Sequence, residues 1–256
     1  MQPRSSRYRK RFGQHFLTSS VLAKKIVDSA RVCDHVVLEI GAGKGILTRH
    51  IAQEAQKVFA VEIDKELAST LKTRAFPHVV VINEDFLRLS IRDYERPVVI
   101  GNIPYSITTL ILEKLIRERD YFKWAVLTLQ KEYAERILAQ SGSRKYGAIT
   151  LYVQYYFSTK KIVVIPSRYF SPRPKVSSVV VSFIKKIPPF TLRDEKKFFD
   201  FIQGVFRYRR KSLKNAILHY LGTLPEGIDK HFLSKRPEHL TLDDFHEIYT
   251  IVEACR

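Results

Sequence analysis

The chain has 256 residues, enough for one full-sized domain with its own hydrophobic core and a smaller second domain. Its 44 lysines and arginines outnumber its 26 acidic residues, and the net charge of +18 favours a polyanionic partner over a small neutral one. Two distant cysteines, Cys33 and Cys255, give no disulfide framework or zinc pattern, and no apolar run is long enough to cross a bilayer. We therefore expect a cytoplasmic protein with no membrane span and no metal.

The positive charge is concentrated in three stretches that contain no acidic residue. They are residues 1–27, 137–193 and 201–225, and the second alone carries ten lysines or arginines. One such cluster is commonly a solvated surface, but three together indicate a polyanion-binding protein. RNA, DNA and an acidic membrane all satisfy this criterion.

The first half of the chain alternates strand and helix patterns. After a basic N-terminal arm, Ser19 or Ser20 is expected to cap a first helix. Strands are expected at 36–40, 58–63, 79–82, 98–100 and 124–129, and helices at 46–55, 65–73, 108–117 and 131–139. Short β-branched strands that alternate with helices predict an α/β fold, in which a mostly parallel sheet is covered by helices on both faces.

The pattern changes in the second half. Strands expected at 161–165 and 177–184 are too close for a crossover helix, so we expect them to pair antiparallel at one edge of the sheet. Ile187-Pro188-Pro189 is expected to be a linker, because consecutive prolines disfavour both a helix and a central strand. Helix-like segments follow at 194–208, 211–221 and 241–253, the last with a possible capping box of Thr241 and Asp244. We predict a first domain at 1–186 and a small all-α domain at 187–256.

Three strand ends in the predicted sheet carry groups suited to a nucleoside. The glycine-rich turn from Glu39 to Gly45 lets backbone approach a ligand closely, although its spacing fits neither the dinucleotide fingerprint nor the Walker pattern. Glu62 could accept hydrogen bonds from ribose hydroxyls, and Asp85 with Phe86 could hold an adenine ring. The alternatives are a surface carboxylate for Glu62 and a helix cap for Asp85, and the shared location at consecutive strand ends weakens both.

The Asn-Ile-Pro-Tyr motif at residues 102–105 follows the fourth strand. Pro104 lacks an amide hydrogen and favours extended backbone before it, so Asn102 is expected to leave the strand in a stiff, open turn. The Asn102 side-chain oxygen and a nearby backbone carbonyl could both accept hydrogen bonds from one amino group. Tyr105 could supply a stacking face for the ring that carries this amine. An ordinary strand-to-helix turn is the alternative.

Several strings in the sequence resemble the ribosomal RNA adenine dimethyltransferases. The shared strings, in family order, are Arg9-Lys10-Arg11-Phe12-Gly13-Gln14-His15-Phe16-Leu17, Leu38-Glu39-Ile40-Gly41-Ala42-Gly43, Glu62-Ile63-Asp64, Glu84-Asp85 and Asn102-Ile103-Pro104-Tyr105-Ser106-Ile107. Those that resemble the KsgA/RsmA branch are Leu129-Gln130-Lys131-Glu132, Tyr146-Gly147, Phe170-Ser171-Pro172-Arg173-Pro174-Lys175-Val176, Arg209-Arg210-Lys211, and Arg236-Pro237-Glu238 with Leu240. The resemblance covers nearly the whole chain.

The resemblance implies a Rossmann-like class I methyltransferase domain that uses S-adenosylmethionine as methyl donor. The residues it assigns to the donor are His15, Leu17, Gly41, Glu62, Asp85 and Asn102, with Gly43 beside the methionine part. Lys44 and Gly45 differ from the residues most common in the family at these positions, where the contact with the donor is made largely by backbone atoms. The implied reaction is dimethylation of the N6 amines of two adjacent adenosines in small-subunit rRNA, with a role in ribosome biogenesis.

Our hypothesis for the mechanism is direct in-line transfer of the methyl group to adenine N6. Asn102 and a carbonyl of the motif would orient the amine, and Pro104 and Tyr105 would shape the base pocket, with no metal or covalent intermediate. The preferred RNA contacts are basic residues in the proline-rich loop between the last two expected strands and after the linker. They are Arg173, Lys175, Arg207, Arg209, Arg210 and Lys211.

Three alternatives remain. A large-subunit rRNA methyltransferase of the antibiotic-resistance type shares the donor and Asn-Ile-Pro-Tyr motifs, although the Arg-Arg-Lys string at 209–211 favours the small-subunit branch. A DNA adenine methyltransferase is disfavoured because Ile103 stands where its motif usually has a proline. A ribosome-assembly or RNA-binding factor with dispensable catalysis is the third. We expect a monomer that meets its rRNA within a pre-ribosomal particle.

Overall fold

The computed structural model describes residues 14–74, 76 and 78–255, so the basic arm and the start of the Arg9–Leu17 string lie outside the described residues. The chain forms two compact units. One, the sheet unit, comprises the chain up to residue 134 and residues 157–185, and the other, the helical unit, comprises 135–156 and 186–256. The sequence-based boundary at 186 gave 135–156 to the first domain. In the structure Tyr146 and Leu151 instead share one apolar cluster with Phe198 and Phe201.

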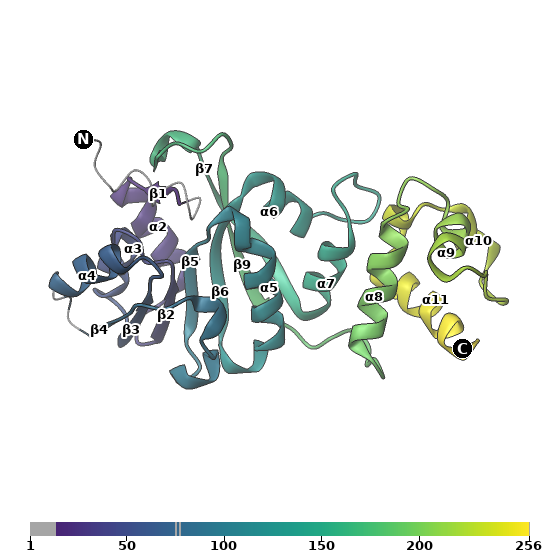
Figure 1. The fold of residues 1–256 in the computed structure, drawn as a ribbon, viewed down its shortest axis with the longest axis horizontal. Coiled ribbons are helices and arrows are strands. Elements are labelled where there is room, and N and C mark those ends of the chain that lie inside the picture. Colours follow the sequence, from purple (N-terminus) through teal and green to yellow (C-terminus); the bar gives the residue numbers. More distant parts are fainter. Residues whose placement is uncertain (1–13, 75, 77, 256) are drawn as a thin grey trace. The chain divides into compact units, whose positions relative to one another are not determined.

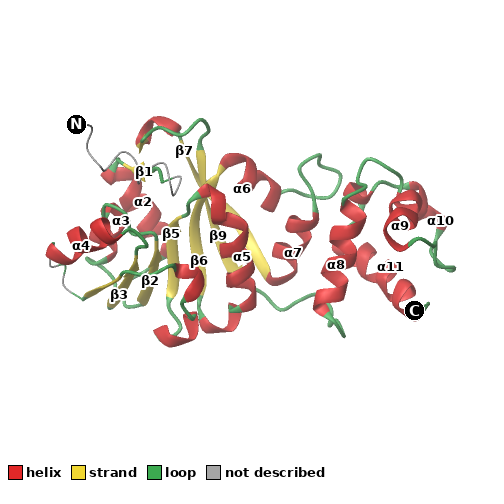
Figure 2. Ribbon diagram, in the orientation of Figure 1, coloured by secondary structure: helices red, strands yellow, loops and turns green. Residues whose placement is uncertain are grey.

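The sheet unit is built on seven hydrogen-bonded strands (Figures 1 and 2). In spatial order they are β4 (Val79–Ile82), β3 (Lys57–Val61), β2 (Val36–Ile40), β5 (Val98–Asn102), β6 (Trp124–Gln130), β9 (Ser178–Lys185) and β7 (Phe157–Ile165). The strands from β4 to β6 are parallel, whereas β9 runs antiparallel to both of its neighbours. The predicted mostly parallel sheet with antiparallel pairing at one edge is confirmed.

Apolar side chains cover both faces of this sheet. On one face, α2 (Ser20–Ala30) and α3 (Ile46–Ile51) pack on the strands. The shared cluster includes Ile26, Leu47, Ile51, Val37, Val98, Val126 and Val180. The alternate strand residues Leu38, Val99 and Leu127 are equally buried, as a parallel sheet with two covered faces requires. The remaining helices of this unit are α4 (Lys65–Thr73), α5 (Thr108–Arg117) and the start of α6 (Lys131–Ile137).

The strand order reverses at the centre of the sheet. Within the seven-stranded sheet β2 comes first in the sequence, and it pairs with β3 on one side and with β5 on the other. The chain therefore moves toward one edge of the sheet after β2 and toward the opposite edge after β5. The carboxyl ends of these strands bring the glycine turn, Glu62 and Asn102 to one edge. Such a switch point is where open α/β sheets bind ligands.

A second, two-stranded sheet fastens the N-terminal segment to the sheet unit. Phe16 and Leu17 form β1, which pairs antiparallel with β8 (Phe170–Ser171) in the loop before β9. The amide of Thr18 continues this contact by donating to the carbonyl of Tyr169 at 2.8 Å. This pairing of two-residue strands was not predicted, and it sets the position of Gln14 and His15.

The helical unit contains α7 (Ala148–Tyr156), α8 (Glu195–Phe206), α9 (Leu213–Leu221), α10 (Lys230–Ser234) and α11 (Leu242–Ala254). The predicted capping box at Thr241 and Asp244 is present.

Short 3-10 helices occur in both units, at Phe86–Arg88, Ile91–Tyr94, Tyr105–Ile107, Arg119–Tyr121, Ser167–Tyr169 and Pro237–His239. Across the residues that the structure describes, no helix combines the length and apolarity needed to span a membrane.

Candidate functional site

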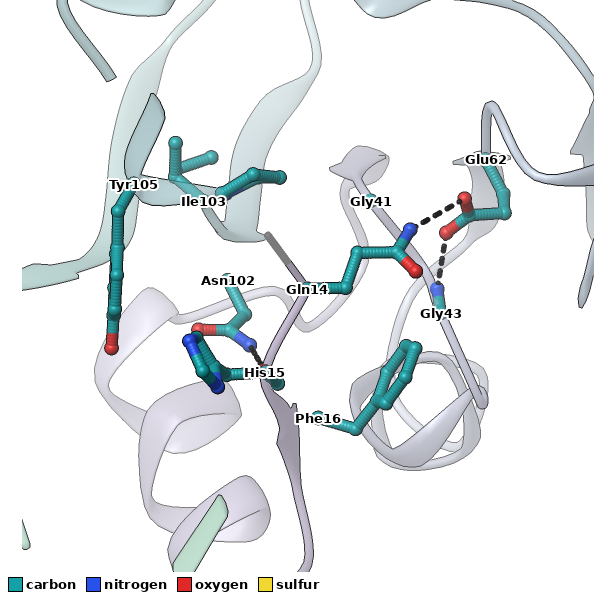
Figure 3. Close-up of a pocket in the computed structure, with 10 residues that line it drawn as sticks. Gln14, His15, Phe16, Gly41, Gly43, Glu62, Asn102, Ile103 and Tyr105 are labelled. Carbon is teal, nitrogen blue, oxygen red and sulfur yellow. Dashed lines mark hydrogen bonds between the residues drawn. The ribbon is translucent and has the colours of Figure 1, made fainter. Parts of the chain in front are cut away.

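A pocket lies at the carboxyl ends of β2, β3 and β5, closed on one side by the segment before β1 (Figure 3). Its lining residues are Gln14, His15, Phe16, Gly41, Gly43, Glu62, Asn102, Ile103, Pro104 and Tyr105. Seven of these were predicted site residues, and they come from segments more than 80 residues apart in the sequence. The strand ends and the N-terminal segment together form the site.

Gly43 allows the glycine-rich turn to pass close to the N-terminal segment. Its φ is +55°, and a Cβ at this position would meet the ring of Phe16 at 3.0 Å. The amide of Gly43 points inward and donates to Oε2 of Glu62 at 2.7 Å. A residue with a side chain would therefore be strained here and would displace Phe16.

Glu62 follows β3 and is 1% exposed. Besides Gly43, the amide of Asp64 donates to its Oε1 at 2.8 Å, and Nε2 of Gln14 approaches the same oxygen at 3.4 Å. Burial raises the pKa of Glu62, and the backbone hydrogen bonds oppose this rise. The contact with Gln14 is the longest of the three, so it is the one that a hydroxyl donor on a ligand can most easily replace.

Asn102 ends β5 with its side chain held in one orientation. Its amide nitrogen Nδ2 donates to the backbone carbonyl of His15 at 2.8 Å. In Figure 3 the amide oxygen lies on the side of Tyr105, and the nitrogen faces the N-terminal segment. No hydrogen bond to this oxygen is found within the described part of the chain, so Oδ1 is available as an acceptor.

Tyr105 stands at the opposite end of the pocket from Glu62 (Figure 3). Its hydroxyl and the Oγ of Ser178 are 2.8 Å apart, and burial raises the pKa of the phenol. The imidazole of His15 lies beside the ring, with the two centroids 5.4 Å apart and the planes tilted by 33°. Nδ1 of His15 donates to the carbonyl of Pro172 at 2.7 Å, which ties the histidine to the proline-rich loop.

Three predicted donor residues do not line this pocket. Leu17 is buried in the apolar core beside α2. Asp85 caps the 3-10 helix that follows it, since its Oδ1 accepts from the amide of Leu87 at 3.0 Å. The ring of Phe86 is buried, with the ammonium of Lys114 5.6 Å from its centroid. The cap on Asp85 uses one carboxylate oxygen, so the alternative considered for this residue is present without excluding a ligand at the other oxygen.

Four residues at the site were not singled out from the sequence. Gln14 and Phe16 belong to the same string as His15, so the string itself was the available signal. Ile103 lies within the Asn-Ile-Pro-Tyr motif and is 2% exposed. Ser178 gave no local signal, because its contact with Tyr105 joins positions 73 residues apart.

The predicted RNA contacts differ in their surroundings. Arg173 and Lys175 are exposed in the proline-rich loop of the sheet unit. In the helical unit Arg207, Arg210 and Lys211 are exposed. Arg209 instead donates to Oε2 of Glu238 at 2.9 Å and to the carbonyl of Arg144, so its guanidinium is engaged within the helical unit.

The pocket thus combines a buried carboxylate, a glycine turn, an oriented amide oxygen and an aromatic ring. This combination suits a ligand with hydroxyl groups next to a second, flat ligand with an amine. No group of three or more His, Cys, Asp or Glu side chains that could hold a metal ion is present in residues 14–74, 76 and 78–255.

Comparison with known proteins agrees with this chemistry. The family model of the ribosomal RNA adenine dimethylases matches residues 5–254. A ribosomal RNA small subunit methyltransferase A from Thermotoga neapolitana is 40% identical over 249 residues, which are 96% of this chain and 92% of that protein. A solved dimethyladenosine transferase from Plasmodium falciparum has a TM-score of 0.81 and 27% identity, covering 94% of this chain and 98% of the other.

The solved 23S rRNA methyltransferase ErmE has the same fold, with a TM-score of 0.73 and 24% identity over 93% of this chain and 99% of its own. The family match and the 40% identity, each over nearly the whole chain, decide the relationship. The chain belongs to the ribosomal RNA adenine dimethylase family, in its small-subunit methyltransferase A branch, and is an S-adenosylmethionine-dependent methyltransferase.

Proposed function

We propose that this enzyme transfers methyl groups to the N6 amines of two adjacent adenosines in small-subunit rRNA, and that Asn102 orients each amine. The observation that carries the proposal is the hydrogen bond from Nδ2 of Asn102 to the carbonyl of His15. It leaves the amide oxygen facing the pocket as an acceptor for an amine hydrogen. The substrate is supported by the relatives, which include a small-subunit rRNA methyltransferase and a dimethyladenosine transferase.

The pocket residues fit the methyl donor. Glu62 is a buried carboxylate whose Oε1 already accepts a long contact from Gln14, and a ribose hydroxyl can take that position. The turn at Gly43 has no side chain to fill the space beside Phe16. We assign the donor to Glu62, Gly41, Gly43 and His15, with Asp85 and Phe86 at the adenine end and Leu17 as a backbone contact.

S-adenosylmethionine supplies an electrophilic methyl group on sulfur. The side-chain oxygen of Asn102 accepts a hydrogen bond from one N6 hydrogen, and a backbone carbonyl of residues 102–105 accepts one from the other. These two bonds favour an N6 lone pair that is directed at the methyl carbon. With the donor bound, the methyl carbon would pass from sulfur to N6, leaving S-adenosylhomocysteine, and the proton released from N6 would pass to solvent. Tyr105 stacks on the base, and the pocket must also admit the monomethylated amine, since each adenosine receives two methyl groups.

The RNA has to present unpaired or flipped adenines, because a paired base hides its amine inside the helix. Arg173 and Lys175 lie in the loop whose Pro172 carbonyl holds His15, so phosphates bound there would lie close to the pocket. In the helical unit we retain Arg207, Arg210 and Lys211 as contacts. We further propose that the enzyme acts as a monomer in the cytoplasm, on rRNA within a pre-ribosomal particle.

To test this, the enzyme and labelled donor are incubated separately with unmethylated small subunits, naked small-subunit rRNA and large-subunit precursors. The product of each reaction is identified by mass spectrometry. We expect N6,N6-dimethyladenosine at two neighbouring positions of the small-subunit RNA. The large-subunit alternative has support from the fold of ErmE alone. Dimethyladenosine confined to large-subunit RNA would overturn the proposed substrate, and no methylated adenine in any sample would overturn the proposed reaction.

A further inference from the structure

We propose that Ser178 is a positioning residue for methyl transfer, which fixes the ring of Tyr105 in the orientation that receives the target adenine. This inference rests on the proposed function, in which Tyr105 is the stacking surface for the base. Within the described residues, the hydrogen bond found for the Ser178 side chain is with the hydroxyl of Tyr105, so its effect on the reaction passes through Tyr105.

The contact joins a residue on a short 3-10 turn to one on a rigid strand. Oγ of Ser178 lies 2.8 Å from the hydroxyl of Tyr105, and Ser178 has no exposed surface. Ser178 is the first residue of β9, which is paired on both sides. Its partners are Gln130 on β6 and Ile165 on β7. A strand held on both edges gives the hydroxyl a fixed reference point.

Tyr105 needs such a reference because a short 3-10 helix does not by itself set the tilt of the ring. It begins the 3-10 helix Tyr105–Ile107, directly after Pro104. The imidazole of His15 restricts one side of the ring at a centroid distance of 5.4 Å. Without a bond to its hydroxyl, the ring could still tilt against that neighbour. Burial raises the pKa of the phenol, so the hydroxyl keeps its proton and the bond persists at neutral pH.

Stacking depends on the orientation of the ring plane, since a base lies flat on an aromatic ring only when their faces are parallel. A tilted Tyr105 would hold the adenine away from the oxygen of Asn102 and from the methyl carbon. Small misplacement of reacting atoms lowers rate more than affinity. Loss of the Ser178 bond should therefore reduce kcat and leave donor binding unchanged.

The test is a double-mutant cycle of Ser178→Ala, Tyr105→Phe and the double variant. Each removes one end of the same bond and keeps the ring. We expect both single variants to lower kcat on small subunits by the same factor, about 2- to 10-fold, as for one neutral hydrogen bond. The double variant should be no slower than either single variant. The affinity for S-adenosylhomocysteine, measured by calorimetry, should stay at the wild-type value.

Ser182→Ala is the matched control, because Ser182 lies on the same strand and its Oγ makes a long, 3.4 Å contact with the carbonyl of Lys160. It should keep the wild-type kcat. Losses that multiply in the double variant, wild-type kcat in Tyr105→Phe, or weakened donor binding in Ser178→Ala would each overturn the inference. If Ser178→Ala fails to fold, Tyr105→Phe still tests the bond from its other end. Absence of activity in the wild-type enzyme would count against the proposed function itself.

Discussion

The backbone carbonyl of His15 accepts a hydrogen bond from Nδ2 of Asn102 at 2.8 Å, across 87 positions of sequence. Because the acceptor is a carbonyl, only the nitrogen of the Asn102 amide can face it, and the amide oxygen is directed to the pocket. The His15 segment is itself held by β1 and by the carbonyl of Pro172. The orientation of the residue proposed to activate the amine thus depends on a segment far away in the sequence.

Replacing Glu62 by alanine should weaken donor binding about 10- to 100-fold, the effect of losing one or two hydrogen bonds to a charged group. Calorimetry with S-adenosylhomocysteine measures this directly. Glu66→Ala is the control, because Glu66 is exposed on α4 and its carboxylate is outside the pocket. Equal affinity of Glu62→Ala and wild type would remove Glu62 from the donor site.

Glu39 should make the stability of the protein depend on pH. It is 1% exposed, accepts from Oγ1 of Thr48 at 2.6 Å, and burial raises its pKa from 4.5 to about 7. Between these values the folded state binds more protons than the unfolded state, so this group's contribution to stability falls as pH rises. The full loss is about 3 kcal/mol.

Urea unfolding of wild type and Glu39→Gln at pH 4.5 and pH 8 tests this. The glutamine side chain cannot ionise, so the stability of the variant relative to wild type should increase from the lower to the higher pH. Effects of all other groups are shared by the two proteins. A constant difference across this range would show that Glu39 does not titrate with a raised pKa.

Lys114 and Glu118 form a buried ion pair that holds the segment after Asp85. Their side chains are 4% and 15% exposed, and Nζ of Lys114 lies 2.5 Å from Oε1 of Glu118. Lys114 also donates to the carbonyl of Leu89. The other oxygen of Glu118 accepts from the amide of Ile91 at 2.6 Å. Lys114→Met should lower the unfolding free energy by about 3 kcal/mol, because it removes the cation that pairs with a largely buried carboxylate.

The control for this pair is Lys185→Met, which breaks the contact of Lys185 with Asp120. Those side chains are 35% and 69% exposed, so the change should cost less than about 1 kcal/mol. Chemical unfolding of both variants gives the comparison. Equal destabilisation by the two substitutions would mean that burial adds nothing to the Lys114 pair.

Arg209 and Arg210 are neighbours with different expected roles. Arg209 is bound to Glu238 and to the carbonyl of Arg144, so Arg209→Ala should lower the stability of the helical unit. Arg210 is exposed, and Arg210→Ala should weaken RNA binding and reduce the slope of log affinity against log salt by about 1. Melting curves and binding titrations at several salt concentrations separate the two. An unchanged salt slope for Arg210→Ala would exclude a phosphate contact there.

Local patterns predicted the sheet well because each strand is a short run of apolar, β-branched residues, and α4, α5 and β4 have the predicted bounds. The helix α7 was not predicted. Its buried residues include Thr150, Val153 and Tyr155, which are typical of strands, and it lacks a polar face because most of it is buried. Here tertiary packing decides the structure against local preference.

The site was predictable where its residues lie at strand ends, since the ends of parallel strands converge at one edge. Glu62 and Asn102 are of this kind. The contacts of Tyr105 with Ser178 and of His15 with Pro172 depend instead on the β1–β8 pairing and on the return of β9. Strands of two residues give no periodic pattern in the sequence, so these contacts could be found only from the structure.

The most direct test of the account is the Asn102→Ala variant, assayed for donor affinity and for methyl transfer on the same preparation. Calorimetry should give an affinity for S-adenosylhomocysteine within about 3-fold of wild type, because the amide oxygen faces the amine and not the donor. Methyl transfer to small-subunit rRNA should fall at least about 100-fold, as when one oriented polar group is removed from an active site. Dimethyladenosine formed at the wild-type rate by this variant would contradict the proposed role of Asn102.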